Sequence, residues 1–194
     1  MQFILLLIAS YFLGSVSFSY IIARAKGKDL SKFGSGNLGG TNMGRAFGAR
    51  WGALVGILDV LKGYIPSYIA FQIYEDPWMI TAVMAAPVIG HIFSAYLGLR
   101  GGKGIATLLG VLLPVLSLPQ VILIFLVWGI AVKLVKIMSI VNIMYVLLVP
   151  GYLWLRFHHP AYVVFGLGID LVIWYAHRSN IKRLLKGTEL KLPI

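Results

Sequence analysis

The chain has 194 residues, of which 59% are hydrophobic and 12% are charged, and its mean hydropathy is +0.88. These values exclude an ordinary soluble globular protein, because this much apolar surface cannot all be buried in one soluble core and must face lipid. The net charge of +11 does not indicate nucleic-acid binding, since most cations lie in short segments between hydrophobic runs. The absence of cysteine excludes disulfides and thiol chemistry.

Seven hydrophobic runs follow one another along the chain. The first is interpreted as a retained membrane span, because it lacks the positive start and the small-residue cleavage site of a signal peptide. The fourth is short, contains Pro114 and ends at Pro119, which predicts a kinked or incomplete span. We therefore expect an all-α integral membrane protein with seven transmembrane helices in a single polytopic domain, residues 1–194. The expected spans are 1–23, 51–74, 78–97, 104–118, 120–136, 138–156 and 160–177.

Lysine and arginine are distributed unevenly between the segments that join these runs. Fifteen lie in segments 24–50 and 98–103, at the junction of the fifth and sixth runs and in the tail, whereas only Arg156 lies in a segment on the other side. Segments rich in Lys and Arg stay in the cytoplasm. We therefore expect the N-terminus outside, the C-terminus in the cytoplasm, and the active site at the cytoplasmic face.

The first basic segment contains a glycine-rich stretch, Ser35-Gly-Asn-Leu-Gly-Gly-Thr-Asn42. Residues 34–39 match the G-x-G-x-x-G pattern of dinucleotide-binding loops, but a charged membrane loop precedes them where that motif needs a buried strand. Closely spaced glycines still let consecutive backbone N–H groups converge on an anion. Taken alone, the stretch has a flexible turn as its alternative interpretation.

A second stretch, Gly101-Gly102-Lys103-Gly104, repeats this chemistry just before the fourth run and adds a cation. A helix that begins there contributes the positive end of its dipole. The stretch is not a Walker A loop, because glycine stands where Ser or Thr must follow the lysine. Two such loops, each with a nearby cation (Arg45 and Lys103), favour phosphate binding over two flexible turns.

The last run ends at His177, which is followed by Asn180. A histidine at a membrane interface can be simply structural or hydrated. With the hydroxyl of Ser35 and the amide of Asn180, it becomes a candidate base or orienting group. The tail beyond it is amphipathic, with Gly187 as a predicted helix stop, and either lies on anionic lipid or acts as a lid over substrate.

Ionisable residues also occur inside the expected spans. Asp59 and Lys62 are three residues apart on one helix and are expected to neutralise each other. His91 is expected to be a buried polar group that joins helices. The sequence has no His-x4-Asp, G-x-S-x-G or H-E-x-x-H motif, so it indicates neither a covalent acyl-enzyme nor a metal site.

Taken in order, the motifs resemble the bacterial acyl-phosphate:glycerol-3-phosphate acyltransferase family, a membrane-integral family. The resemblance rests on stretch 35–42 with Arg45, on Gly90-His91 with 101–107, and on Asn180-Ile-Lys-Arg-Leu-Leu-Lys-Gly-Thr-Glu189, and its outline covers the whole chain. The sequence departs from the family's usual alanine, proline, lysine and serine at Gly40, Ser94, Arg100 and Asn142.

The resemblance implies transfer of a fatty acyl group from acyl phosphate to the sn-1 hydroxyl of glycerol 3-phosphate, giving lysophosphatidic acid and phosphate. This is the first acylation step of phospholipid synthesis, at the bacterial cytoplasmic membrane. The implied partners are glycerol 3-phosphate, a fatty acyl phosphate and membrane lipid, with no nucleic acid, no metal or other cofactor, and no acyl-CoA or acyl-carrier-protein donor.

The candidate site residues combine this resemblance with the chemistry of the motifs. The expected catalytic residues are Ser35, His177 and Asn180. The expected phosphate-binding residues are Arg45, Lys103, Gly36, Gly39, Thr41, Asn42, Gly101, Gly102 and Gly104. The expected supporting residues are Asp59, His91, Ser139 and Glu189.

The expected mechanism needs no protein nucleophile, because acyl phosphate is an activated mixed anhydride. Catalysis then consists of positioning and electrostatic stabilisation. Either His177 or the phosphate leaving group takes the hydroxyl proton, and the sequence leaves both routes open. The alternative function is a transporter of a small phosphate-containing anion. Such a protein needs a midplane site and cations on both faces, whereas one face here is nearly bare.

Overall fold

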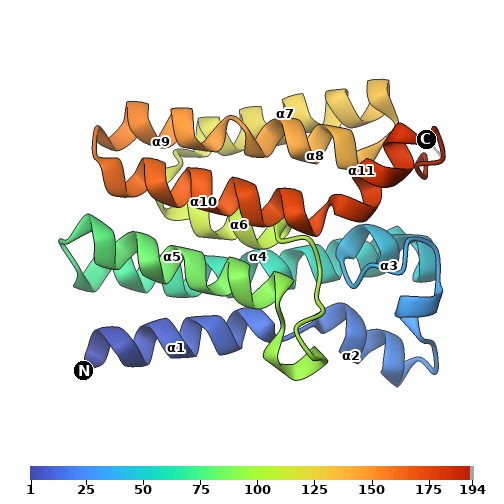
Figure 1. Ribbon diagram of the computed structural model, residues 1–194, viewed down its shortest axis with the longest axis horizontal. Coiled ribbons are helices and arrows are strands. Elements are labelled where there is room, and N and C mark those ends of the chain that lie inside the picture. Colours follow the sequence, from blue (N-terminus) through green and yellow to red (C-terminus); the bar gives the residue numbers. More distant parts are fainter. Residues whose placement is uncertain (193–194) are drawn as a thin grey trace. The chain divides into compact units, whose positions relative to one another are not determined.

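The computed structural model describes residues 1–192, and every regular element in that range is helical (Figure 1). The helices form two compact units, Met1–Pro114 and Val115–Ile194. Many large apolar side chains stay exposed, as expected for surfaces that face lipid. The chain is a multi-pass helical protein, which confirms the predicted fold class at this level.

In the first unit, long helices pack against one another and against shorter ones. Its elements are α1 (Gln2–Ser15), α2 (Phe18–Ala25), the 3-10 helix η1 (Leu30–Lys32), α3 (Gly40–Phe47), α4 (Ala49–Ile73), α5 (Pro77–Ile92), η2 (Ala95–Leu97) and α6 (Ile105–Leu112). Helix α1 packs on α5, and α4 packs on α6, α5 and α3. The α4–α6 crossing is close because Gly63 meets the Thr107 backbone and Gly110 meets the Val60 backbone.

Two features of this unit matter for the site. Helix α1 ends at Ser15 and α2 begins at Phe18, so the first apolar stretch is a broken helix with Val16 in an extended conformation. The segment expected to be a loop between the first two spans contains α3, which the sequence analysis missed. The apolar residues of α3 at helical spacing are only Met43, Ala46 and Phe47, so this short glycine-rich segment offered no long periodic run from which to predict it.

The described part of the second unit, residues 115–192, contains five α-helices. Helix α7 (Leu118–Val135) follows a Ser117–Gln120 capping box, in which Ser117 N donates to Gln120 Oε1 at 2.8 Å. Helices α8 (Met138–Val146) and α9 (Val149–Phe157) together make one apolar stretch. Helix α10 (Pro160–Ala176) packs on α9 and continues after a bend of 60° into α11 (Arg178–Leu185).

The predicted stop of the tail helix at Gly187 is confirmed. Gly187 has φ +67°, its N–H donates to Leu184 O at 3.1 Å, and Thr188 N donates to Arg183 O at 2.8 Å. These two bonds form a Schellman motif, which uses a left-handed glycine to end a helix. The chain is thereby turned back beneath α11, and Glu189 returns toward the helix face.

The seven expected spans are matched only in part. Among the described residues, five helical stretches are long and apolar enough to cross a membrane, and the bent α10–α11 pair makes a sixth. The fourth expected span is the short helix Ile105–Val115, which rises only about 16 Å. That is about half the thickness of a bilayer's hydrocarbon core. The seven-span count, the orientation of the termini and the single domain stay predictions.

Candidate active site

The first glycine loop, residues 33–39, is held from inside by Asn42. Its side chain is buried, its Nδ2 donates to Phe33 O (2.9 Å) and Asn37 O (3.0 Å), and its Oδ1 accepts from Ser35 N (3.1 Å). Gly36 has φ +69°, a left-handed conformation that favours glycine. The sequence analysis expected Asn42 to bind phosphate directly. Because its amide is committed to the loop backbone, we assign it to holding the loop instead.

Helix α3 begins directly after this loop, with Gly39 as its N-cap. The carbonyl of Gly39 accepts from Asn42 N and Met43 N, and the N–H groups of Gly40 and Thr41 point out of the helix end. Such an end attracts anions through these donors and the helix dipole. Arg45 lies one turn beyond Thr41 on the same face and is half-buried.

Asp29 stabilises the entry to this loop. It lies outside the membrane-spanning segments. Its Oδ1 accepts from Ser31 Oγ at 2.6 Å and from Ser31 N at 3.1 Å, and its Oδ2 lies 3.3 Å from Arg24 Nη2. The Ser31 hydroxyl, with smaller contributions from the Ser31 N–H and Arg24, lowers the pKa of Asp29 below its ordinary value.

The second glycine loop leads into α6, as the sequence predicted. Gly104 has φ +83° and caps the helix, and Leu108 N donates to its carbonyl at 2.7 Å. Gly102 is buried, and its N–H donates to His91 O at 3.0 Å, which ties the loop to the end of α5. Lys103 is half-buried one residue before the cap. Both predicted loops therefore end at helix N-termini.

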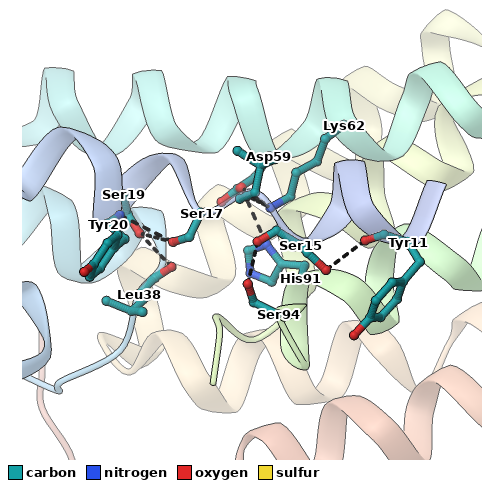
Figure 2. A network of polar contacts seen from close by, with 11 residues as sticks. Tyr11, Ser15, Ser17, Ser19, Tyr20, Leu38, Asp59, Lys62, His91 and Ser94 are labelled. Carbon is teal, nitrogen blue, oxygen red and sulfur yellow. Dashed lines mark hydrogen bonds and ion pairs between the residues drawn. The ribbon is translucent and has the colours of Figure 1, made fainter. Parts of the chain in front are cut away.

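A buried polar network lies between α1, α4 and α5 (Figure 2). Lys62 Nζ lies 2.9 Å from Asp59 Oδ1, and His91 Nδ1 lies 3.5 Å from the same oxygen. This confirms the predicted Asp59–Lys62 pair and the prediction that His91 joins helices. We call Asp59, Lys62 and His91 the buried triad.

The triad is tied to the break between α1 and α2. Lys62 Nζ donates to Val16 O at 2.7 Å, and Ser94 Oγ donates to Ser15 O at 2.6 Å (Figure 2). These donors satisfy carbonyls that the end of a helix leaves open, which matters most where water is absent. Ser94, where the family usually has proline, thus gains a partner that sequence alone could not reveal.

The second unit gathers three polar side chains around Glu189. Its Oε1 accepts from Asn180 Nδ2 (2.6 Å) and Ser139 Oγ (3.2 Å), and its Oε2 accepts from Arg183 Nε (2.7 Å). The structure therefore brings Ser139, which is distant in the sequence, to Asn180 and Glu189 of the last motif. It adds Arg183, for which the sequence gives no signal, because a basic helix face does not indicate an inward partner.

The Glu189 carboxylate also fixes the direction of the Asn180 amide. A carboxylate accepts hydrogen bonds, so the amide NH₂ must face it and Oδ1 must point elsewhere. Asn180 is 2% exposed, and its Oδ1 is buried without a hydrogen-bond partner among residues 1–192. A buried acceptor in this condition costs about 1–3 kcal/mol, and a ligand hydroxyl would satisfy it.

His177 occupies the bend between α10 and α11 and is fully buried. Its Nδ1 lies 2.8 Å from Ile173 O. Since a carbonyl can only accept, Nδ1 carries the proton and Nε2 of the neutral ring is an acceptor. This tautomer suits either a base or a group that orients a hydroxyl.

The described residues hold no group of three or more His, Asp or Glu side chains placed to bind one metal ion. The fold and the loops define a class: a polytopic helical membrane protein with two glycine-rich, cation-containing loops that lead into helix N-termini. Comparisons with known proteins make this class specific.

The family model described as glycerol-3-phosphate acyltransferase matches residues 4–187. The glycerol-3-phosphate acyltransferase of Aquifex aeolicus (strain VF5) is 43% identical, over 97% of this chain and 98% of that protein. The one from Endomicrobium trichonymphae is 39% identical, over 98% and 96%. The chain belongs to the glycerol-3-phosphate acyltransferase family.

Solved structures agree with this assignment. A crystal structure of PlsY (YgiH), an integral membrane glycerol 3-phosphate acyltransferase, in its glycerol 3-phosphate form matches with a TM-score of 0.92 and 39% identity. The match covers 99% of this chain and 96% of that one. The lysophosphatidic acid form of the same protein matches with a TM-score of 0.87. The resemblance seen in the motifs is thereby confirmed.

Proposed function

We propose that this chain transfers a fatty acyl group from acyl phosphate to the sn-1 hydroxyl of glycerol 3-phosphate, giving lysophosphatidic acid and phosphate. It is an acyltransferase that catalyses the first acylation step of phospholipid synthesis. The observation that carries the proposal is the full-length match to a glycerol 3-phosphate acyltransferase whose structures were solved in glycerol 3-phosphate and lysophosphatidic acid forms. Those two molecules are the acceptor and the product of this reaction.

The first unit supplies the groups assigned to the phosphates. Helix α3 begins at Gly40, five residues before Arg45, helix α6 begins at Ile105, two residues after Lys103, and the glycines leave the backbone open to close approach. Besides these two cations, we assign phosphate binding to Gly36, Gly39, Thr41, Gly101, Gly102 and Gly104. Neutralising two phosphates of like charge is the main electrostatic task of this reaction.

The hydroxyl chemistry is assigned to side-chain acceptors. The glycerol oxygen attacks the acyl carbonyl carbon, the bond from that carbon to the phosphate oxygen breaks, and phosphate leaves with the electron pair. We assign Ser35, His177 and Asn180 to orienting the hydroxyl. Its proton goes to His177 Nε2 or to the leaving phosphate. The tautomer of His177 and the direction of the Asn180 amide support acceptor roles for both.

We further propose seven crossings of the bacterial cytoplasmic membrane, with the N-terminus outside. The positive charges support this orientation in spite of the short α6 segment. If residues 104–118 did not cross, the cations would divide nine against seven between the two sides, whereas crossing gives fifteen against one. A cysteine at position 31 or 188 should be labelled from the cytoplasm, and one at 75 or 158 from outside. Labelling of position 31 from outside would contradict the orientation.

Donor choice tests the function directly. Purified protein with glycerol 3-phosphate should form lysophosphatidic acid from acyl phosphate and none from acyl-CoA or acyl-carrier protein. Chelators should leave the rate unchanged. A robust acyl-CoA rate in a preparation free of other acyltransferases would overturn the proposed donor.

A further inference from the structure

The second glycine loop is moulded around His91 by two different contacts. A Cβ atom added to Gly101 would overlap the backbone carbonyl oxygen of His91. A Cβ atom added to Gly102 would overlap the Nε2 end of the His91 ring instead. The two neighbouring glycines are therefore needed for separate reasons. Gly101 leaves room for the backbone of α5, and Gly102 leaves room for the imidazole of His91.

The imidazole cannot easily move away from Gly102. His91 is 7% exposed, and its Nδ1 faces Asp59 Oδ1, which is also bound by Lys62 Nζ at 2.9 Å. Lys62 is 2% exposed and is anchored to Val16 O. Because the ring is buried beside the Asp59–Lys62 pair, rotating it away from Gly102 needs room that neighbouring side chains already fill. Figure 2 shows the His91 ring lying beneath Asp59 and beside Ser94.

We propose that the buried triad is a template for the Gly101–Gly104 loop, with His91 as a positioning residue for Lys103. The proposal rests on the assigned function of that loop in phosphate binding. The ring sets the path of the backbone at Gly102, and Lys103 is the next residue. Glycine at 102 is then required by the histidine, independently of any contact with substrate.

The same network extends toward the first loop. Ser94, three residues after His91, donates to Ser15 O, and Lys62 donates to Val16 O, so the triad fixes the break between α1 and α2. Just after the break, Ser19 Oγ donates to Leu38 O at 2.8 Å within the first glycine loop (Figure 2). The two loops are therefore joined through one buried polar path.

Paired substitutions separate the ring contact from the backbone contact. Gly102→Ala should raise the KM for glycerol 3-phosphate or lower kcat by about 10- to 100-fold, the scale of a displacement of about 1 Å in a binding group. In the background His91→Ala, the added methyl has room. The double variant His91→Ala/Gly102→Ala should therefore be more active than Gly102→Ala alone.

Gly101→Ala is the matched control. Its clash is with the His91 carbonyl, which every residue at 91 retains, so His91→Ala should not rescue it. The proposal would be overturned if His91→Ala rescued Gly101→Ala to the same extent. It would also be overturned if the activity losses of His91→Ala and Gly102→Ala simply multiplied in the double variant. If His91→Ala does not fold in detergent, His91→Ser supplies the smaller side chain for the same comparison.

Hydrogen exchange over residues 98–105 provides a readout that needs no catalysis. Exchange at this loop should rise in Gly102→Ala and fall again in His91→Ala/Gly102→Ala. It should stay high in the control double variant His91→Ala/Gly101→Ala. A wild-type protein with a protected loop and no acyl transfer would defeat the proposed function alone. If substitution of His91 does not change the exchange pattern, the template proposal fails and the proposed function is unaffected.

Discussion

The two units prepare the groups that we assign to substrate binding in opposite ways. In the first unit the groups are mainly backbone N–H donors at the starts of α3 and α6, held by buried polar side chains behind the loops. In the second unit the groups are side-chain atoms of His177 and Asn180, oriented by one backbone carbonyl and one carboxylate. Backbone sites depend on packing around glycines, whereas the side-chain site depends on single hydrogen bonds. Substitutions should therefore reduce activity for different physical reasons in the two units.

The largest losses are expected at the cations of the first unit. Arg45→Ala or Lys103→Ala should each cost about 2–5 kcal/mol of transition-state stabilisation, the scale for removing one partner of a desolvated charge pair. Lys103→Arg should recover little, because a planar guanidinium does not replace a compact ammonium beside a glycine loop. The measurement is kcat/KM for both substrates. Near wild-type kinetics in Arg45→Ala would remove that residue from the site.

The carboxylate of Glu189 should rank next, because it orients the second unit's site. Glu189→Gln replaces one accepting oxygen by a donor and weakens three hydrogen bonds, at about 1–3 kcal/mol for a bond to a charged group. Ser139→Ala is the control, since it removes only the longest of the three at 3.2 Å. Its loss in activity should be much smaller. Equal losses in the two variants would show that Asn180 is not held by Glu189.

His177 distinguishes the two routes for the proton. If it is the base, kcat/KM falls at low pH as the imidazole becomes protonated, and His177→Asn removes both this acid limb and most activity. If phosphate takes the proton, His177→Asn keeps part of the rate and an acid limb near about pH 6, from the substrate phosphate. We favour the second route, because an activated donor needs no strong base. A fully active His177→Ala enzyme would contradict both.

The smallest effect is expected at the entry to the first loop. Since the folded protein lowers the pKa of Asp29, its ionised form contributes stability above the pKa of the unfolded chain, about 3.9. That contribution is lost as the pH falls through the lower, folded pKa. Asp29→Asn should therefore lower Tm slightly at neutral pH, and the difference from wild type should shrink in acid. A difference that is unchanged at low pH would show that the carboxylate's charge has no part in it.

The sequence predicted most of the spans and the location of both glycine loops. Apolar runs and loop charges are local signals that the sequence contains directly. Glycines spaced around a cation indicate anion binding whatever the surrounding fold. The Asp59–Lys62 pair followed from helical spacing alone. Family resemblance supplied Ser139 and Glu189 as site residues.

Other features depend on contacts that a local pattern cannot contain. Helix α3 has an apolar face of only three residues, and the short Ile105–Val115 helix was hidden in a run that continued to Leu118. The inward role of Arg183 depends on a turn at Gly187 that returns Glu189 to α11. The fixed role of Asn42 depends on carbonyls 5 to 12 residues away meeting its amide.

Phosphate release from purified protein tests the central claim most directly. With acyl phosphate and glycerol 3-phosphate both present, phosphate and lysophosphatidic acid should appear in equal amounts. Omitting either substrate should abolish the lysophosphatidic acid and leave only the slow hydrolysis seen without enzyme. Arg45→Ala serves as the matched inactive control. Phosphate release that does not depend on glycerol 3-phosphate, or that yields no acylated product, would contradict the account.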